Sequence, residues 1–246
     1  MKYLKQLKIK KIVVISITLL TLLALLTTTG YSSAIAFSNS NTLINNNTTS
    51  ANGVLTVHFL DVGQADATLI QLPNGQVMLI DGGESKNDNS ILRYIRNLNI
   101  TKIDYLIATH PHADHIGGLP AIIEALNIGS IYAPKVSHTT DTYVKFLTAI
   151  DKKGIQIDSA TAGVSILSSQ GLQIDIVAPT RNYSDLNDNS AVIKITYDTT
   201  SFLFMGDAGT RSENNITANI SADVLKIGHH GQTSISTIPG LEKQFQ

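Results

Sequence analysis

From Val54 onward, short apolar or alternating segments recur at regular intervals, a pattern that predicts many strands with a few helices between them. Alternation of apolar and polar residues, or a short apolar run between turn residues, is typical of a strand. Segments with this pattern are Val54–Leu60, Thr68–Leu72, Gln76–Ile80, Ile103–Ala108, Ser130–Ala133, Val164–Leu167, Leu172–Ala178, Ala191–Tyr197, Ser201–Met205 and Val224–Ile227. The turn residues Pro73-Asn74-Gly75 predict that the second and third strands form a hairpin.

Helices are predicted at three places between the strands. The apolar residues of Ser90–Leu98 recur every three or four positions, which is typical of an amphipathic helix. The segments Gly117–Leu126 and Asp141–Lys152 are also predicted to be helical. Strands in meanders with interspersed helices predict two sheets that are covered by helices on their outer faces. The expected fold class is therefore α/β, a four-layer αββα sandwich.

The N-terminus differs in composition from the rest of the chain. Five lysines within residues 1–11 precede the apolar run Ile12–Leu26, and Ala34-Ile35-Ala36 follows after small and polar residues. A basic start, a short apolar run and an A-x-A end predict a signal peptide, residues 1–36, that is cleaved after Ala36. The alternative is an uncleaved membrane anchor, because residues 12–36 are just long enough to cross a bilayer. Either way we expect a protein that is secreted or held at the extracellular face of the membrane.

Residues 37–53 are rich in Asn, Ser and Thr and predict a flexible linker, so the folded domain should comprise residues 54–246. Residues 37–246 contain 13 Lys and Arg and all 19 Asp and Glu, a formal net charge of −6. This charge makes non-specific nucleic-acid binding unfavourable, because such affinity comes mostly from Lys and Arg. The chain has no cysteine, which excludes disulfides and thiolate metal ligands.

A dense cluster of metal-binding residue types follows the predicted strand Ile103–Ala108. It is the run His110-Pro111-His112-Ala113-Asp114-His115. Imidazole nitrogens and carboxylate oxygens suit Zn²⁺, Mn²⁺ or Fe. A short loop cannot direct all four of these side chains at one ion. It can direct His110 and His112 at one ion, and Asp114 and His115 at a second ion nearby.

This run, followed by Ile116-Gly117-Gly118, resembles the motif of the metallo-β-lactamase superfamily. Four further segments resemble the extracellular hydrolase domain of ComEC-type competence proteins, in the same order: His58–Ala67, Leu79–Gly83, Phe204–Ala208 and Leu225–Gly231. The similarity extends from about Val54 to Ser236 and does not include the membrane channel of those proteins. It is a resemblance to a stand-alone, secreted hydrolase domain.

The resemblance implies two divalent metal ions, zinc or manganese, and a role for each residue. It assigns His110 and His112 to the first ion, Asp114 and His115 to the second, and Asp207 to both as a bridging carboxylate. One of His229 and His230 should complete the second site. A likeness to secreted choline-phosphate esterases of this fold favours His230 as the ligand. Asp114 and His229 are then the expected catalytic residues, through water orientation and contact with the substrate or leaving group.

Several other polar residues are expected to play supporting parts. Asp81 should orient the metal-binding histidines from behind. Asp61 and Asp66 are predicted either to act similarly or to cap an ordinary turn. His58 and His138, which belong to no metal-binding motif, are expected to be structural or solvated.

The sequence departs from the family pattern at three places. Ala65 stands where the family has glycine, which predicts a shifted turn. The third histidine of the first metal site is replaced by Asn187-Asp188-Asn189-Ser190, so that Asp188, Asn189 or water should fill the position and the first ion should bind more weakly. The family continues beyond the His-His motif, so the resemblance implies that the C-terminal part of the domain is missing after Gln246.

Together these features predict an exported two-metal hydrolase of phosphodiester or related ester bonds, in DNA or in the phosphocholine groups of cell-wall polymers. The acidic charge argues mildly against long nucleic acids. Two alternatives remain, a non-catalytic metal-binding surface module and a β-lactam or lactone hydrolase. Nothing in the sequence indicates a stable protein partner, and membrane association is expected only if residues 1–36 are retained.

Overall fold

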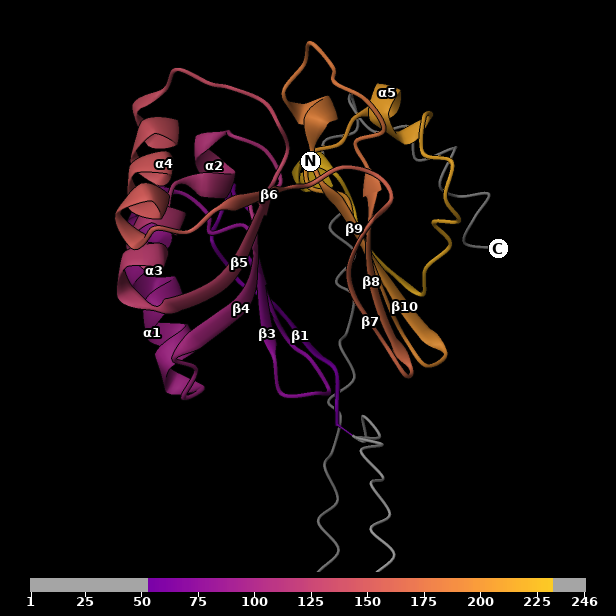
Figure 1. Ribbon diagram of the computed structural model, residues 1–246, viewed down its shortest axis with the longest axis horizontal. Helices are drawn as coiled ribbons and strands as arrows, with labels where there is room; N and C mark the ends of the chain where they lie inside the picture. Colours follow the sequence, from indigo (N-terminus) through magenta and orange to yellow (C-terminus); the bar gives the residue numbers. More distant parts are fainter. Residues whose placement is uncertain (1–52, 232–246) are drawn as a thin grey trace, which may run out of the picture. The chain divides into compact units, whose positions relative to one another are not determined.

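The computed structural model describes residues 53–231, which form two β-sheets that lie face to face (Figure 1). The predicted signal peptide, residues 1–36, nearly all of the predicted linker, and residues 232–246 lie outside the described residues. The first sheet contains, in spatial order, β1 (Thr56–Phe59), β2 (Thr68–Gln71), β3 (Val77–Ile80), β4 (Lys102–Ile107), β5 (Asn127–Ala133) and β6 (Ile157–Ser159). The second contains, in spatial order, β11 (Val224–Lys226), β10 (Thr200–Phe204), β9 (Val192–Tyr197), β8 (Leu172–Ala178) and β7 (Val164–Ser169).

Three helices lie on the outer face of the six-stranded sheet (Figure 1). They are α1 (Asp88–Asn97), α3 (Leu119–Ala125) and α4 (Asp141–Lys153). In the described part of the chain two further helices are short, α2 (Ala113–Ile116) and α5 (Thr210–Glu213), and three 3₁₀ turns are formed by Ser85–Asn87, Asn187–Asn189 and His229–Gly231. None of the helices within residues 53–231 has the length and apolar character needed to cross a bilayer.

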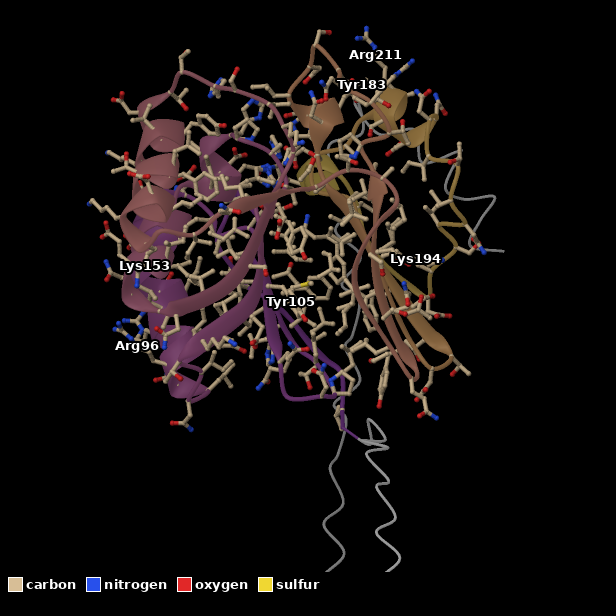
Figure 2. All side chains as sticks on the ribbon, in the orientation of Figure 1. Arg96, Tyr105, Lys153, Tyr183, Lys194 and Arg211 are labelled. Atoms are coloured by element: carbon tan, nitrogen blue, oxygen red, sulfur yellow. The ribbon has the colours of Figure 1, made fainter. Side chains whose placement is uncertain are left out.

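The alternating pattern of each strand divides the core into layers. On β3, Leu79 packs with the residues of α1 and α3, whereas Met78 and Ile80 face the second sheet. Ile174 and Ile193, from β8 and β9, meet them from the other side. Figure 2 shows Tyr105 of β4 in this space between the sheets. Because side chains alternate between faces of a strand, the six-stranded sheet is buried on both sides.

The outer face of the five-stranded sheet carries a third apolar cluster. It contains Val192, Leu203 and Met205, and Ile216 and Ile220 from the segment after α5 pack against it. In the described residues this outer layer consists only of α5 and that segment. It is therefore smaller than the layer of three helices on the outer face of the six-stranded sheet. The arrangement is the α/β sandwich that the sequence predicted.

The predicted strands and long helices are confirmed, with ends that shift by up to three residues. Strand β5 begins at Asn127 instead of Ser130, because it pairs in parallel with the whole of β4. Strand β6 and helices α2 and α5 were not predicted. Each has only three or four residues, too few for a hydrophobic period to be recognised.

Candidate metal centre

The candidate metal-binding residues gather at one edge of the sandwich, where strands of both sheets end. Strand β4 leads into His110, and helix α2 carries Asp114 and His115 directly afterwards. From the second sheet, β10 leads to Asp207 and β11 to the histidine pair. Gly206 has a φ of +55°, and a Cβ there would approach the Cβ atoms of Thr109 and Ser190 to about 3 Å. A glycine at this position therefore allows the Asp207 turn to pack closely against the histidine loop.

Asp81 has the supporting position that the sequence predicted. It follows β3 in a left-handed conformation, with φ +58°, which is uncommon for a non-glycine residue. Its Oδ1 accepts a hydrogen bond from the backbone N–H of Thr109 at 2.8 Å, and its Oδ2 lies 2.8 Å from Nδ1 of His115. Because a carboxylate accepts, His115 donates through Nδ1 and presents Nε2 to the centre.

His110 and His112 form one donor pair. Nε2 of His110 lies 3.0 Å from Nδ1 of His112, close to the separation of about 3.3 Å expected for two nitrogens that share one zinc ion. His110 Nδ1 contacts the hydroxyls of Thr109 at 3.2 Å and Ser190 at 3.3 Å. Asp207 Oδ2 is 3.8 Å from Nε2 of His110. Two imidazoles and one carboxylate therefore converge on this side of the centre.

The second donor group lies on the other side of Asp207. Nε2 of His115 is 3.2 Å from Oδ1 of Asp207, and Nε2 of His230 is 3.1 Å from Oδ2 of Asp114 and 3.7 Å from Oδ2 of Asp207. His115, Asp207, His230 and Asp66 each offer a donor atom within 4.8 Å of the others. The sequence-predicted residues thus come together in two groups, with the carboxylate of Asp207 common to both.

Two buried atoms in this cluster lack hydrogen-bond partners. They are Nε2 of His115 and Oδ1 of Asp207, which face one another at 3.2 Å without the geometry of a hydrogen bond. Buried polar atoms in native proteins nearly always have partners, and an unsatisfied pair needs an explanation. A divalent cation between them would satisfy both. The residues present therefore fit a metal centre of histidine nitrogens and carboxylate oxygens.

The histidine pair lies in an unusual left-handed turn. His229, His230 and Gly231 all have positive φ, at 50°, 54° and 80°. Instead of alternating along a strand, both rings therefore approach Oδ2 of Asp207, at 3.9 Å from Nε2 of His229 and 3.7 Å from Nε2 of His230. Non-glycine residues in this region cost free energy and concentrate at functional sites.

The two histidines differ in what their Nδ1 atoms contact. Nδ1 of His230 faces the carboxylate of Asp66 at 3.2 Å, whereas Nδ1 of His229 faces the amide nitrogen of Asn187 at 3.5 Å. A carboxylate only accepts, so His230 donates through Nδ1, and a metal ion that displaces the other proton of the ring would bind at Nε2. The contact of His229 is by contrast with a neutral side-chain amide.

Of the residues expected to fill the place of the family's third histidine, Asn189 does not face the centre. The side chain of Asn189 points into its own loop, where it bonds the backbone of Tyr183 and Asp185. Its donors and acceptor are used there, which argues against a role as a ligand. Asn187 instead faces His229, and Ser190 contacts both His110 and the backbone of Asp207.

Ala65 has a backbone conformation that does not require glycine. It is absent from the residues of positive φ within the described part of the chain, and its methyl group is buried against the core. Alanine therefore adopts this backbone without strain, and the shift of the turn relative to the family pattern stays a prediction.

His138 lies closer to the centre than the sequence indicated. Its ring is edge-on to that of His112, with centroids 6.0 Å apart, and its Nδ1 contacts the hydroxyl of Thr140 at 2.9 Å. By contrast, His58 lies apart from the cluster and bridges Gln71 and Tyr94. No sequence motif pointed to His138, because its approach depends on the loop between β5 and α4.

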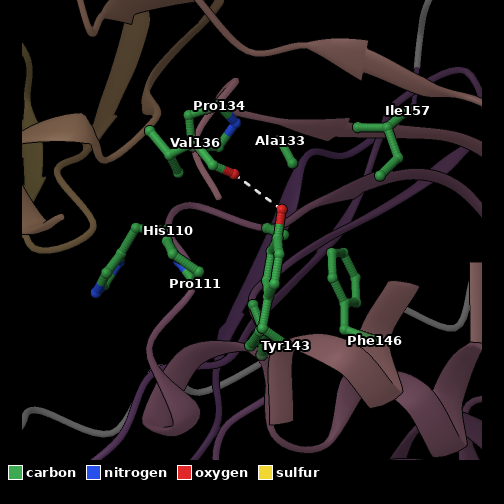
Figure 3. A pocket seen from close by; sticks show the side chains of 10 residues that line it. His110, Pro111, Ala133, Pro134, Val136, Tyr143, Phe146 and Ile157 are labelled. Atoms are coloured by element: carbon green, nitrogen blue, oxygen red, sulfur yellow. Dashed lines mark hydrogen bonds between the residues drawn. The ribbon is translucent and has the colours of Figure 1, made fainter. Parts of the chain in front are cut away.

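A small apolar cavity of about 40 Å³ lies beside His110 (Figure 3). Tyr143 donates a hydrogen bond to the carbonyl oxygen of Val136 at 2.8 Å and so fastens the loop that carries His138. Burial in these apolar surroundings, with the neighbouring charge of His115, lowers the pKa of His110 well below its usual value. The neutral form of the ring, which a metal ligand requires, is thereby favoured.

The pKa values of two other histidines, His115 and His230, are raised instead of lowered. Burial alone would lower the pKa of His115, but Asp81 and Asp207 raise it to about 10 in the metal-free protein. Hydrogen bonding to Asp114 and Asp66 raises the pKa of His230 to about 9. Burial would raise the pKa of Asp114, but the hydrogen bond with His230 and the charge of His115 lower it to about 2. At neutral pH the metal-free centre therefore holds imidazolium rings beside carboxylates.

Metal binding should accordingly release protons. His115 and His230 are protonated at pH 7 in the metal-free protein, and a metal ligand must be neutral, so we expect up to two protons per chain to leave and the affinity to rise between pH 7 and pH 9. The contacts of these imidazolium rings stabilise the metal-free fold fully below about pH 6.5 and are lost as pH rises through about 9 to 10. Calorimetric titration with Zn²⁺ in buffers of different ionisation enthalpy measures the release. Affinity that is independent of pH would contradict this account.

The comparison with known proteins agrees with the fold and the cluster. A family model described as the Metallo-beta-lactamase superfamily matches residues 60–237. The match covers most of the chain, which therefore belongs to the metallo-β-lactamase superfamily and is a metal-dependent hydrolase.

The relatives narrow the resemblance to a ComEC-type hydrolase domain. The chain is 28% identical over 198 residues to ComE operon protein 3 of Bacillus subtilis, a match that covers 71% of this chain and 25% of that protein. It is 32% identical over 188 residues to Recombination protein 2 of Haemophilus influenzae, covering 73% and 22%. It is also 33% identical over 66 residues to the UPF0173 metal-dependent hydrolase H16_A2129 of Cupriavidus necator, covering 27% and 22%. The chain thus spans about a quarter of the length of these relatives.

Proposed function

We propose that the protein is an exported hydrolase that uses two divalent metal ions to cleave phosphodiester or related ester bonds. The observation that carries this proposal is the position of Asp207. Its carboxylate lies between the pair His110 and His112 on one side and the group His115 and His230 on the other. A carboxylate shared by two donor groups is the arrangement expected of a two-metal site.

In this proposal His110, His112 and Asp207 hold the first ion, and Asp207 also holds the second. The remaining ligands of the second ion are Asp114, His115 and His230. The donor set is nitrogen and oxygen only, which suits zinc and also manganese. When bound, the ions supply Lewis-acid activation of water and of a phosphoryl or carbonyl oxygen.

Asp114 is the residue best placed to orient the attacking water. Its side chain is 33% exposed, so it can meet both the protein interior and a substrate. Oδ2 faces His230, and an ionised carboxylate has further lone pairs that accept a hydrogen bond from water. Its lowered pKa keeps it an acceptor at neutral pH.

His229 is the proposed proton donor to the leaving group. Its Nε2 points toward the centre, 3.9 Å from Oδ2 of Asp207, and its Nδ1 faces the side-chain amide of Asn187. Protonation of a leaving oxygen by a positioned imidazolium, which returns to neutral imidazole, is ordinary general-acid catalysis. Asn187 thereby helps to orient the ring for this role.

The substrate class is proposed from the relatives and from the chemistry of the centre. The names of the relatives refer to competence and recombination, which favours DNA as a substrate, and the phosphocholine groups of cell-wall polymers are the other candidate. The net charge of −6 after residue 36 favours a short or singly charged substrate over a long nucleic acid. Both candidates contain a phosphodiester, and metal ions restore positive potential at the centre itself.

The substrate class is tested by two chromogenic assays on the same metal-loaded protein. We expect turnover of bis-p-nitrophenyl phosphate and none of a chromogenic cephalosporin. Turnover of the cephalosporin alone would favour the β-lactam hydrolase. Bound metal without turnover of either compound, or of a phosphocholine ester and single-stranded DNA, would favour the non-catalytic surface module.

Export is proposed from the basic and apolar N-terminus. The expected result is that residues 1–36 are removed, so that mass spectrometry of secreted protein finds Phe37 as the first residue. Membrane-bound protein that retains Met1 would show an anchor instead of a cleaved peptide. Protein found only inside the cell would contradict export altogether.

A further inference from the structure

Asp66 occupies a fixed position beside the metal centre, in the connection between β1 and β2. Its backbone N–H donates to the carbonyl oxygen of Asp114 at 3.1 Å, and its own carbonyl oxygen accepts from the N–H of Gly83 at 2.8 Å. The residue is 7% exposed. Its backbone is therefore held between the histidine loop and the turn that follows Asp81, so the direction of its side chain is well defined.

The carboxylate of Asp66 has two partners, both from the second sheet. Oδ1 lies 3.2 Å from Nδ1 of His230, and Oδ2 accepts a hydrogen bond from Nζ of Lys226 at 2.5 Å. Lys226 is the last residue of β11, and His230 lies in the left-handed turn that follows it. The carboxylate of Asp66, in the connection between two strands of the first sheet, thus contacts both the end of β11 and the turn that follows it.

The contact of Asp66 with His230 repeats the contact of Asp81 with His115. In each pair a buried carboxylate faces Nδ1, and Nε2 of the same ring points to Asp207, at 3.2 Å for His115 and 3.7 Å for His230. The carboxylate in each pair fixes which nitrogen carries the proton. His230 needs such support more than His115, because it lies in a strained turn and not in a helix.

A competing interpretation is that Asp66 is itself a metal ligand, since its donor atom lies within 4.8 Å of those of His115, Asp207 and His230. Both oxygens of Asp66 are already engaged, however, and one of them by a lysine ammonium. The side chain of Lys226 is only 20% exposed. A cation at this position disfavours a second cation on the same carboxylate.

We propose that Asp66 is a positioning residue that orients His230 toward the metal centre, and that Lys226 holds Asp66 in this role. The inference rests on the proposed function, because it takes His230 as a ligand. It adds to that function a group of three residues, Lys226, Asp66 and His230, that connects the two sheets. This group holds the turn that carries His230, after β11, in a fixed position relative to the metal ligands that follow the strands of the first sheet.

The test measures binding of Co²⁺ to the full chain and to three variants, by competition with a chromophoric chelator. Asp66→Asn should still bind two ions, but the binding constant of the second ion, which His230 helps to hold, should fall roughly 10–100-fold relative to wild type. Lys226→Met should change the affinity in the same direction. Asp61→Asn is the matched control, because Asp61 is an exposed carboxylate of the same connection that only caps a turn through Gly63. Its affinity should equal that of wild type.

Lys226→Met separates the two interpretations. If Asp66 were a ligand, removal of the competing ammonium would leave the affinity unchanged or increase it, and Asp66→Asn would lose one ion and alter the visible spectrum of bound Co²⁺. Either result would overturn the proposal. Circular dichroism of the metal-free variants shows whether they fold.

A measurement on the wild-type protein needs no variant. Nitrogen-15 NMR of the Zn²⁺-loaded chain should show His230 with a proton on Nδ1 and the metal on Nε2. Metal on Nδ1 would overturn the proposal even if no variant folds. Wild-type protein that binds no metal would contradict the proposed function, whereas normal binding that neither substitution changes would contradict only the role of Asp66.

Discussion

Replacement of Asp207 by alanine should remove both metal ions and abolish hydrolysis. Asp207 lies 3.8 Å from Nε2 of His110 and 3.2 Å from Nε2 of His115, so both donor groups lose a carboxylate in a single substitution. The variant also leaves several imidazoles with less compensating negative charge. We expect the rate to fall at least on the order of 10³-fold, since loss of even one preorganised electrostatic group costs about 10²–10³-fold.

The metal content of the purified variant, measured by inductively coupled plasma mass spectrometry, is the direct readout for Asp207→Ala. Asp158→Ala is a suitable control, because Asp158 is an exposed carboxylate of the short edge strand β6. The control should keep two ions and full activity. Retention of two ions by Asp207→Ala would show that Asp207 is not the carboxylate shared by the two metal ions.

Replacement of the two adjacent histidines should separate metal binding from proton transfer. His230→Ala should lose metal and activity together, because Nε2 of His230 is free to bind metal while Asp66 holds Nδ1. His229→Ala should keep both ions and lose about 10²–10⁴-fold in kcat, the usual effect of removing a general acid. This loss should be smaller for p-nitrophenyl esters, since p-nitrophenolate leaves without protonation.

Metal stoichiometry and kcat of both variants, on p-nitrophenyl and alkyl esters, decide the assignment. Loss of metal in His229→Ala but not in His230→Ala would show that His229 is the ligand and His230 the proton donor. Loss of one ion in each variant would place His229 at the first site, where the family's third histidine is missing. Two bound ions and full activity in both variants would show that the last motif has no part in the centre.

Much of the fold could be predicted because its long elements carry regular hydrophobic patterns. The hairpin of β2 and β3 follows from alternating residues on either side of a Pro-Asn-Gly turn, and α1 from its helical spacing. Helix α2 and strand β6 escaped prediction because elements of three or four residues form through tertiary contacts. Strand β6, for example, exists through its parallel pairing with β5.

The centre was predictable where its ligands lie close together in sequence, as in the run His110–His115. Contacts between distant segments could not be derived in the same way. Asp66 and Lys226 are 160 positions apart, and only the packing of one sheet on the other brings them together. Similarly, nothing in the sequence indicated that Asn187 contacts His229 or that Ser190 contacts His110. The left-handed turn of the histidine pair also gives no sequence signal.

Titration of the metal-stripped full chain with Zn²⁺, in which bound ions are counted by native mass spectrometry and hydrolysis of bis-p-nitrophenyl phosphate is followed in parallel, tests the central claim most directly. Two donor groups that share Asp207 should bind two ions per chain, and turnover should appear with metal and reach its maximum at two equivalents. A chain that binds at most one ion, or that binds two and shows no metal-dependent cleavage of any phosphodiester, would contradict the account.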